Sequence, residues 1–239
     1  DIVVLGVDGA DDIIIDGDDN GSTVTFQNND TSTLSGFTVQ GGSGMMEATS
    51  EAEWYDGGEI TRTTIVYYGG GIYVSGAEST LEDLIVTKNE LSSYSYTIDG
   101  GTGNITEKLS FGGGLYVEDG VATLENVELS QNSADSGGGA YVSADAALVG
   151  THDIYDANNA SSGGGVTSDG TLVATNSIFA NNTSTGTGND WGGAAVNITD
   201  GIAYLTNVTV IGNDSHTSAS VYNWKGGSLN IKNAILTEN

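Results

Sequence analysis

The chain has 239 residues, with 37 glycines and neither cysteine nor proline. Its 32 acidic residues and five lysines or arginines give a formal net charge of −27, which excludes nucleic acid and membrane insertion from its expected contacts. No disulfide can form, so a continuous core must hold the fold together. The apolar run at residues 2–5 is too short to span a membrane and no basic leader precedes it, so we expect a mature fragment or a piece of a longer protein.

Residues 1–42 carry the pattern of one or two structural repeats, in the segments IIIDG and STLSGFTV. Between these segments, DGDDNG resembles the front half of a calcium-binding loop of the form D-x-D-x-N-G. Asp16, Asp18 and Asn20 would then ligate Ca²⁺, although Gln27 stands where such a loop has its closing glutamate. The same residue types are common in ordinary turns, so a calcium site and a plain turn both remain open.

From residue 69 onward, one motif recurs six times. It opens with Gly-Gly-Gly-x-Tyr-Val or a variant of it, and it closes on an asparagine. The openings begin at Gly69, Gly112, Gly137, Gly163, Gly192 and Ser218, and the closing residues are Asn89, Asn132, Asn159, Asn182, Asn213 and Asn239. A period of about 25 residues with insertions predicts a solenoid, because one such unit cannot bury a core alone.

Within each unit, apolar and polar residues alternate, as in ATLENVEL at 122–129 and AYLTNVTV at 203–210. This alternation, with abundant Val, Ile, Thr and Tyr, predicts strands rather than helices. We therefore predict an all-β solenoid of about seven to nine coils with three short strands in each. Equivalent strands should stack in parallel, about 4.8 Å apart. The closing asparagines should form a ladder of hydrogen bonds at one turn.

The sequence predicts one domain over residues 1–239, interrupted by insertions at 41–68, 90–111 and 183–191. All three insertions leave the repeat just before the glycine run. In a stack of repeats, equivalent corners form a column, so we expect the insertions to project from one corner. The first two lie on adjacent coils and should touch each other.

Aromatic residues are concentrated in these insertions, and they suggest three readings. They are Trp54, Tyr55, Tyr67, Tyr68, Tyr94, Tyr96 and Trp191. One reading is a carbohydrate-binding platform, because aromatic rings stack on the apolar faces of sugars. The second is that the aromatics pack the insertions together as a small core of their own. The third is a contact with a protein partner, where Tyr and Trp are favoured.

The glycine-rich repeats resemble those of right-handed parallel β-helix proteins of the pectate-lyase-like superfamily. The segment Phe179-Ala-Asn-Asn182, followed by Gly192-Gly-Ala-Ala, is similar to the FxxN and GGA(I/L/V) repeats of bacterial surface proteins of the polymorphic outer-membrane-protein and adhesin type. The resemblance covers nearly the whole chain. It implies a right-handed, single-stranded β-helix at the cell surface or outside the cell, but no single activity, since β-helices include lyases, hydrolases, adhesins and stalks.

Uronate-cleaving lyases use a cation to neutralise a carboxylate and a Lys or Arg to remove the α-proton. On a lyase-like reading, the catalytic residues would be Arg62, Lys88 and Lys108, which lie in or beside the insertion corner. The alternative is that these cations form ion pairs within acidic loops. His152 and His216 are isolated in the sequence, and no nucleophilic triad can be assembled from them.

We therefore expect a non-catalytic extracellular or cell-surface protein: an adhesin passenger, a stalk or a self-assembling filament subunit. A polysaccharide-binding or lyase-like module is the alternative. No amphipathic cap is visible at either end, which favours flanking domains or head-to-tail stacking of identical chains. Nine N-x-Ser/Thr sequons occur where about four would arise by chance, either because asparagine is favoured in the turns or because the chain is glycosylated.

Overall fold

The computed structural model describes residues 2–28, 31–55, 58–100, 103–187 and 192–237. All regular secondary structure within these ranges is β-strand, as the alternating pattern predicted. Most strands pair in parallel with the equivalent strand of the next repeat. The described residues contain no helix long and apolar enough to cross a membrane.

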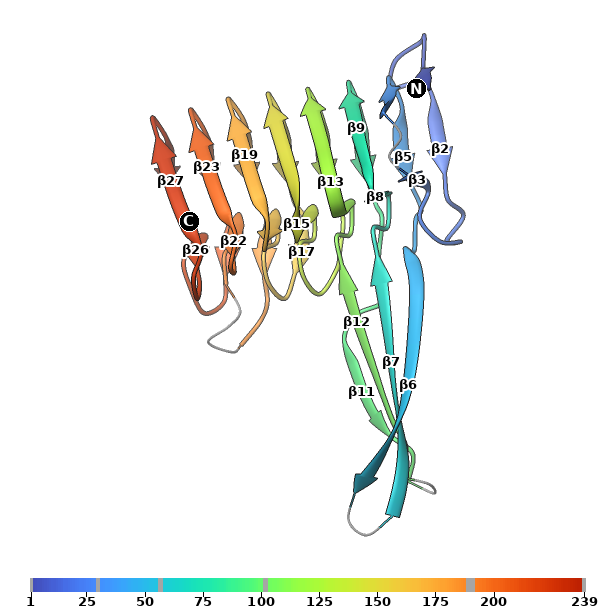
Figure 1. Cartoon of the computed structure of the whole chain (residues 1–239). Coiled ribbons are helices and arrows are strands. Elements are labelled where there is room, and N and C mark those ends of the chain that lie inside the picture. The colour runs from blue at the N-terminus through green and yellow to red at the C-terminus, as the bar shows by residue number, and fades with distance from the viewer. Residues whose placement is uncertain (1, 29–30, 56–57, 101–102, 188–191, 238–239) are drawn as a thin grey trace.

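The largest sheet contains two rows of strands that run along the stack and join end to end, because its two longest strands continue from one row into the other (Figure 1). The first row consists of β1 (Val3–Leu5), β4 (Thr31–Ser35), β9 (Ala77–Glu82), β13 (Leu115–Glu125), β15 (Ala140–Thr151), β19 (Thr171–Thr175), β23 (Ile202–Thr206) and β27 (Ser228–Lys232). The second row consists of β3 (Val24–Gln27), β8 (Ile72–Ser75), the first parts of β13 and β15, β18 (Val166–Ser168), β22 (Val196–Ile198) and β26 (Val221–Asn223).

Two further parallel sheets complete the stack. The larger has the order β2 (Ile14–Asp16), β5 (Thr38–Gln40), β10 (Ile85–Thr87), β14 (Glu128–Ser130), β16 (Ile154–Asp156), β20 (Ile178–Ala180), β24 (Thr209–Ile211) and β28 (Ile235–Thr237). The smaller contains β17 (Asn159–Ala160), β21 (Thr183–Ser184) and β25 (Asp214–Ser215).

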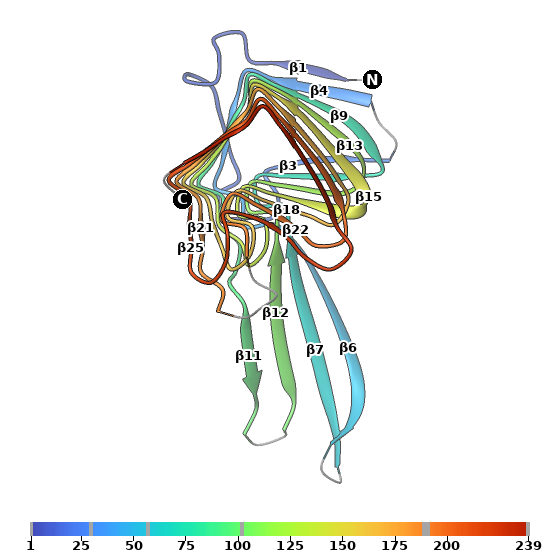
Figure 2. The ribbon, with the colours of Figure 1, turned by 90° about the vertical axis from the view of Figure 1, so that its left-hand side faces the viewer.

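Consecutive strands of one repeat go to different rows, and each pairs with its equivalent in the next repeat. Strands β22, β23 and β24, for example, pair in order with β26, β27 and β28. Seen along the stack, the strands of successive repeats superimpose and surround an interior (Figure 2). This parallel arrangement is compatible with a β-helix or another solenoid, and it contradicts an antiparallel sandwich or propeller.

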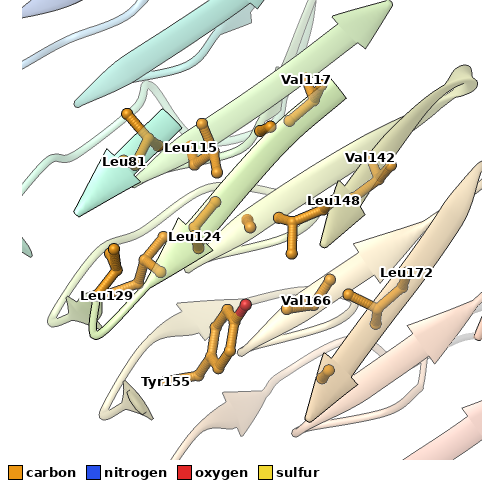
Figure 3. Close-up of a cluster of buried hydrophobic side chains, with 14 of the residues drawn as sticks. Leu81, Leu115, Val117, Leu124, Leu129, Val142, Leu148, Tyr155, Val166 and Leu172 are labelled. Atoms are coloured by element: carbon orange, nitrogen blue, oxygen red, sulfur yellow. The ribbon is translucent and has the colours of Figure 1, made fainter. Parts of the chain in front are cut away.

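Apolar side chains fill the interior in columns that run along the stack (Figure 3). One column of strand partners contains Leu34, Leu81, Leu124, Gly150, Ala174 and Leu205. A second contains Val39, Val86, Leu129, Tyr155, Phe179 and Val210. Where the first column has its smallest members, the second has its largest. The rings of Tyr155 and Phe179 stack with their centroids 4.5 Å apart.

Buried asparagines form the ladder that the sequence predicted. Its members are Asn89, Asn132, Asn158, Asn182 and Asn213. Each of the first four donates a side-chain N–H to the Oδ1 atom of the next, over 2.9 to 3.1 Å. The same oxygen accepts the backbone N–H of the preceding member. The amides therefore replace the backbone pairing that is lost where the chain turns.

The prediction that Asn159 belongs to this ladder was wrong, because Asn158 takes the position instead. A residue with positive φ precedes each ladder asparagine: Lys88, Gln131, Ala157, Asn181 and Gly212. Ala157 therefore fixes Asn158 as the buried member. Asn159 begins β17, and its side chain is exposed. The predicted final member, Asn239, lies outside the described residues.

The first two insertions form β-hairpins. Strands β6 (Met45–Tyr55) and β7 (Gly58–Tyr68) are antiparallel, as are β11 (Ser95–Ile98) and β12 (Ile105–Phe111). Strand β12 also pairs in parallel with β7, which gives a four-stranded sheet in the order β11-β12-β7-β6. The prediction that these insertions touch is confirmed. We call this sheet the arm, since it projects from one corner of the stack (Figure 2).

Candidate functional site

No other described part of the structure covers either face of the arm over most of its length (Figure 1). Its edge strands are largely exposed, while the central strands β7 and β12 are mostly half-buried. Every residue from 46 to 52 in β6 is exposed. Because side chains alternate across a strand, the pairing registers divide the arm into two faces. We call them the Arg62 face and the Trp54 face. Strand pairing places Glu107 on the Arg62 face and Lys108 on the Trp54 face.

Aromatic rings pack where the arm joins the stack. The ring of Tyr68, the last residue of β7, lies 6.0 Å from Phe111 and 4.8 Å from Tyr116 between ring centroids. Phe111 in turn meets the edge of Tyr141 at 4.9 Å. Two insertion residues thus continue a ring stack that begins in the repeats. This observation favours the packing role for Tyr68 among the three roles considered for the insertion aromatics.

Three tyrosines of successive repeats form a column at this root. Tyr116 stacks between Tyr73 and Tyr141, with centroid distances of 5.7 and 5.5 Å. The outer two donate their hydroxyl hydrogens to Glu118 and Asp169, over 2.5 Å in each case. Burial raises the pKa of Tyr116 to about 12, and it raises the pKa values of Tyr73 and Tyr141 further. All three phenols are therefore neutral at physiological pH.

Asp135, which follows the ladder residue Asn132, anchors the second hairpin to the stack. Its Oδ1 atom accepts the backbone N–H of Tyr94 at 2.6 Å, and its Oδ2 atom accepts the hydroxyl of Ser110 at 2.9 Å. The backbone N–H of Asp135 donates back to the Ser110 oxygen at 2.8 Å. Burial raises the pKa of this carboxyl. One side chain therefore fixes both ends of the insertion that carries β11 and β12.

The structure does not gather the predicted aromatic residues on one surface. Trp54 and Tyr67 lie on one face of the arm, and Tyr68 and Tyr96 lie on the other. Trp54 is the most open, with 79% of its surface exposed, whereas Tyr96 is 46% exposed. Tyr94 precedes β11 and is 49% exposed.

Tyr55 and Trp191 complete the set of predicted aromatics. Tyr55 ends β6 opposite Gly58, and Trp191 lies outside the described residues. Binding of carbohydrate by the aromatic set stays a prediction.

The three cations of the lyase-like reading do not converge. The Nε atom of Arg62 is 3.1 Å from Glu53, and Nη1 is 3.8 Å from Glu107. The hydrogen bond and charge of Glu53 raise the pKa of the Arg62 guanidinium. Lys108 projects from the opposite face, three residues along the strand. Lys88 occupies an exposed turn after β10. The arrangement of Arg62 matches the ion-pair alternative.

The loop considered for calcium is organised by hydrogen bonds of its first aspartate. Asp16 Oδ1 accepts the backbone N–H of Asp18 at 3.0 Å, and Asp16 Oδ2 accepts the side-chain amide of Gln40 at 2.8 Å. These bonds, that of Gln40 first, lower the pKa of Asp16. The described residues include no group of three or more His, Cys, Asp or Glu side chains placed to hold a metal ion. Calcium binding by Asp16, Asp18 and Asn20 stays a prediction.

Neither histidine lies in a strand that pairs with the arm. His152 occupies a turn with positive φ, and its Nε2 atom is 3.4 Å from the side-chain nitrogen of Asn176. It helps to line a cavity of about 280 Å³ together with Asp83 and Asn126. His216 follows β25, where its backbone N–H donates to Ser184. Neither histidine has a nucleophile or carboxylate partner among the described hydrogen bonds.

A buried carboxylate that the sequence analysis did not single out lies in the core. Asp153 is 1% exposed, and its Oδ1 atom accepts the backbone N–H of Val127 at 3.0 Å. Its Oδ2 atom and the hydroxyl of Tyr155 have no hydrogen-bond partner within the described structure. Burial raises the pKa of Asp153 to about 7. Alignment of the repeats would have given a signal, since Leu84 and Val127 hold the equivalent positions.

Several sequons coincide with structural asparagines. Asn182 and Asn213 are ladder members, and Asn197 is buried in β22. Asn181 and Asn207 occupy turns with positive φ. These positions support the turn explanation for much of the excess of sequons.

Comparison with known proteins finds no relative of this chain. No family model matches the chain, and neither a curated protein nor a solved structure is found to be similar to it. Assignment of a role therefore depends on the geometry of the stack and the arm.

Proposed function

We propose that the chain is a non-catalytic, extracellular or cell-surface protein built as a right-handed, single-stranded parallel β-helix with three short strands per coil. In this proposal the repeats form a scaffold of the adhesin, stalk or filament type, and the arm is its interaction element. The observation that carries the proposal is the arm itself: a four-stranded sheet with exposed edge strands, held by Asp135 and by aromatic stacking to a stack with a continuous core.

The separation of the three cations supports the non-catalytic assignment. A lyase needs its charge-neutralising group and its base on the same sugar, within hydrogen-bond reach of the reacting atoms. Arg62 is engaged with two glutamates on one face, and Lys108 lies on the other. The test is incubation with a panel of uronate polymers while ultraviolet absorbance of unsaturated products is followed. We expect no increase. An increase that Arg62→Ala or Lys108→Ala abolishes would overturn the assignment.

Self-assembly by head-to-tail stacking is the second part of the proposal. Such stacking would cover the exposed apolar side chains of Leu5 and Val7 in the first repeat and of Ile235 and Leu236 in the last described repeat. Light scattering at increasing concentration, with and without calcium, tests this part. Growth of elongated particles is expected. A monodisperse monomer at high concentration would leave only the stalk or passenger role.

The exposed location is tested separately. Intact cells of the source organism are treated with protease, and the protein is followed with an antibody against the arm. Digestion in intact cells is expected. Digestion only after lysis would contradict the surface assignment without bearing on catalysis.

Carbohydrate binding is the second candidate, and the exposure of Trp54 is the observation that favours it. The same uronate polymers and neutral glycans can be titrated while tryptophan emission is recorded. A saturable change lost in Trp54→Ala would establish a sugar-binding surface at the arm.

A further inference from the structure

Strand β6 leaves one long edge of the arm open. Its 11 residues pair with β7 in an unbroken register from Met45 to Tyr55. Among the described residues, no strand pairs with its other side. The opposite edge of the arm is formed by β11, which has only four residues. The β6 edge therefore presents a row of backbone N–H and C=O groups without strand partners, over a length that an added strand could match.

The β6 edge lacks several of the features that usually prevent strand addition, although it carries three glutamates. Natural edge strands are often short or carry lysine, proline or a bulge. Strand β6 contains neither lysine nor proline, and its pairing with β7 has no register shift. Such an edge is the usual template for recognition of an extended peptide by strand addition.

The side chains of β6 specify what kind of strand would fit. Glu47, Glu51 and Glu53 share the Arg62 face of the arm. The opposite face of β6 carries apolar residues, including the exposed Met46 and Trp54. Glu53 is paired with Arg62, whereas Glu47 and Glu51 make no ion pair within the described structure. A strand with basic residues on one face and apolar residues on the other would complement both rows.

Charge also argues against a second copy of this chain as the occupant. Two β6 strands side by side would bring glutamates against glutamates, which is destabilising. The whole chain has only Arg62, Lys88, Lys108, Lys225 and Lys232 as basic residues, and no strand of the described residues contains two of them. The complementary segment must therefore come from another polypeptide.

We propose that the outer edge of β6 binds an extended basic segment of another protein by strand addition, with alternating lysine or arginine and apolar residues. Backbone hydrogen bonds to the β6 edge would determine the length and the orientation of the bound strand. Glu47 and Glu51 would select the basic face, while Met46, Ala48, Ala52 and Trp54 would contact the apolar face. The proposal is independent of head-to-tail stacking and of catalysis.

The test uses the whole chain and a labelled peptide of about nine residues in which lysine and valine alternate. Fluorescence anisotropy should show saturable binding. Glu47→Lys should weaken it about tenfold. Glu59→Lys is the matched control: it makes the same charge change at the position opposite Trp54, on the other face of the arm. It should have a much smaller effect, and circular dichroism should confirm that both variants are folded.

Two further peptides keep the result decisive if a variant fails to fold. One has the same composition with lysines and valines in separate blocks, and the other is N-methylated at alternate residues, which removes the strand hydrogen bonds. Both should bind far more weakly to the unaltered chain. Equal binding by either peptide, or equal weakening by Glu47→Lys and Glu59→Lys, would show attraction by net charge alone and overturn the proposal. Self-association of the unaltered chain that an excess of the alternating peptide abolishes would replace the proposed occupant with a second copy.

Discussion

Gly150 and Tyr155 lie in the same repeat, where the smallest residue of one core column accompanies the largest residue of the other. An ideal Cβ atom built on Gly150 would lie 3.5 Å from the Tyr155 hydroxyl oxygen. The two residues belong to neighbouring core columns five positions apart, and the same spacing joins Ala174 to Phe179. In the preceding repeat, the same two column positions hold Leu124 and Leu129, so neither position has a small residue there. The core thus balances a small residue in one column with a large one in the other.

Gly150→Ala should destabilise the fold by about 2 kcal/mol, because the added methyl group would collide with the Asp153 carboxylate. Urea unfolding measures the loss. Gly100→Ala is the control, since an added Cβ at that position meets nothing within 4 Å. Equal midpoints for the two variants would refute this account of the core.

Asp153→Asn should stabilise the protein above pH 7 and have little effect near pH 4. The pKa of Asp153 is raised to about 7 by burial, against 3.8 without it. The folded state binds this proton more tightly, so the contribution is fully present below pH 3.8 and is lost as pH rises through 7. The shift corresponds to roughly 4 kcal/mol as an upper value. Urea midpoints at pH 4 and pH 8 test it, with exposed Asp145→Asn as control. A gain that does not depend on pH would exclude the titration of Asp153.

Asn158→Ala should cost about 3 kcal/mol, because it removes the acceptor of the Asn132 backbone N–H and leaves the Leu129 carbonyl without its amide donor. The adjacent Asn159→Ala changes an exposed residue and should be nearly neutral. Thermal or urea unfolding compares them. A larger loss of stability from Asn159→Ala than from Asn158→Ala would contradict the assignment of Asn158 to the ladder.

Tyr116→Phe should reduce the loss of stability that we expect between pH 10 and 12. Burial raises the pKa of Tyr116 to about 12, against an ordinary value of 10. Its contribution is present below pH 10 and is lost as the pH rises through 12, since the unfolded phenol ionises first. Urea midpoints at pH 9 and 11.5 measure the slope. Tyr204→Phe, at a half-exposed position, is the control. An equal change of the urea midpoint between pH 9 and 11.5 in Tyr116→Phe and in the unaltered protein would contradict a contribution from Tyr116.

The glycine and asparagine periodicity was enough to predict the parallel stack, the ladder and the contact between the first two insertions. It did not predict which of Asn158 and Asn159 is buried, because that depends on the positive φ of Ala157, a residue type with no preference for it. The faces of Trp54 and Tyr68 depend on the register of β6 with β7, which composition does not specify. The periodicity did not predict the burial of Asp153 either, because the equivalent positions of the preceding repeats hold the apolar residues Leu84 and Val127.

The compensation between Gly150 and Tyr155 has a consequence for how such a chain can change its length. In the repeats of Gly150 and Ala174, the small residue and the large residue that compensates for it belong to the same repeat. Duplication or loss of a whole repeat by unequal recombination would therefore extend or shorten the molecule without opening a void. Exchange of half a repeat would separate the two residues and leave either a hole or a clash.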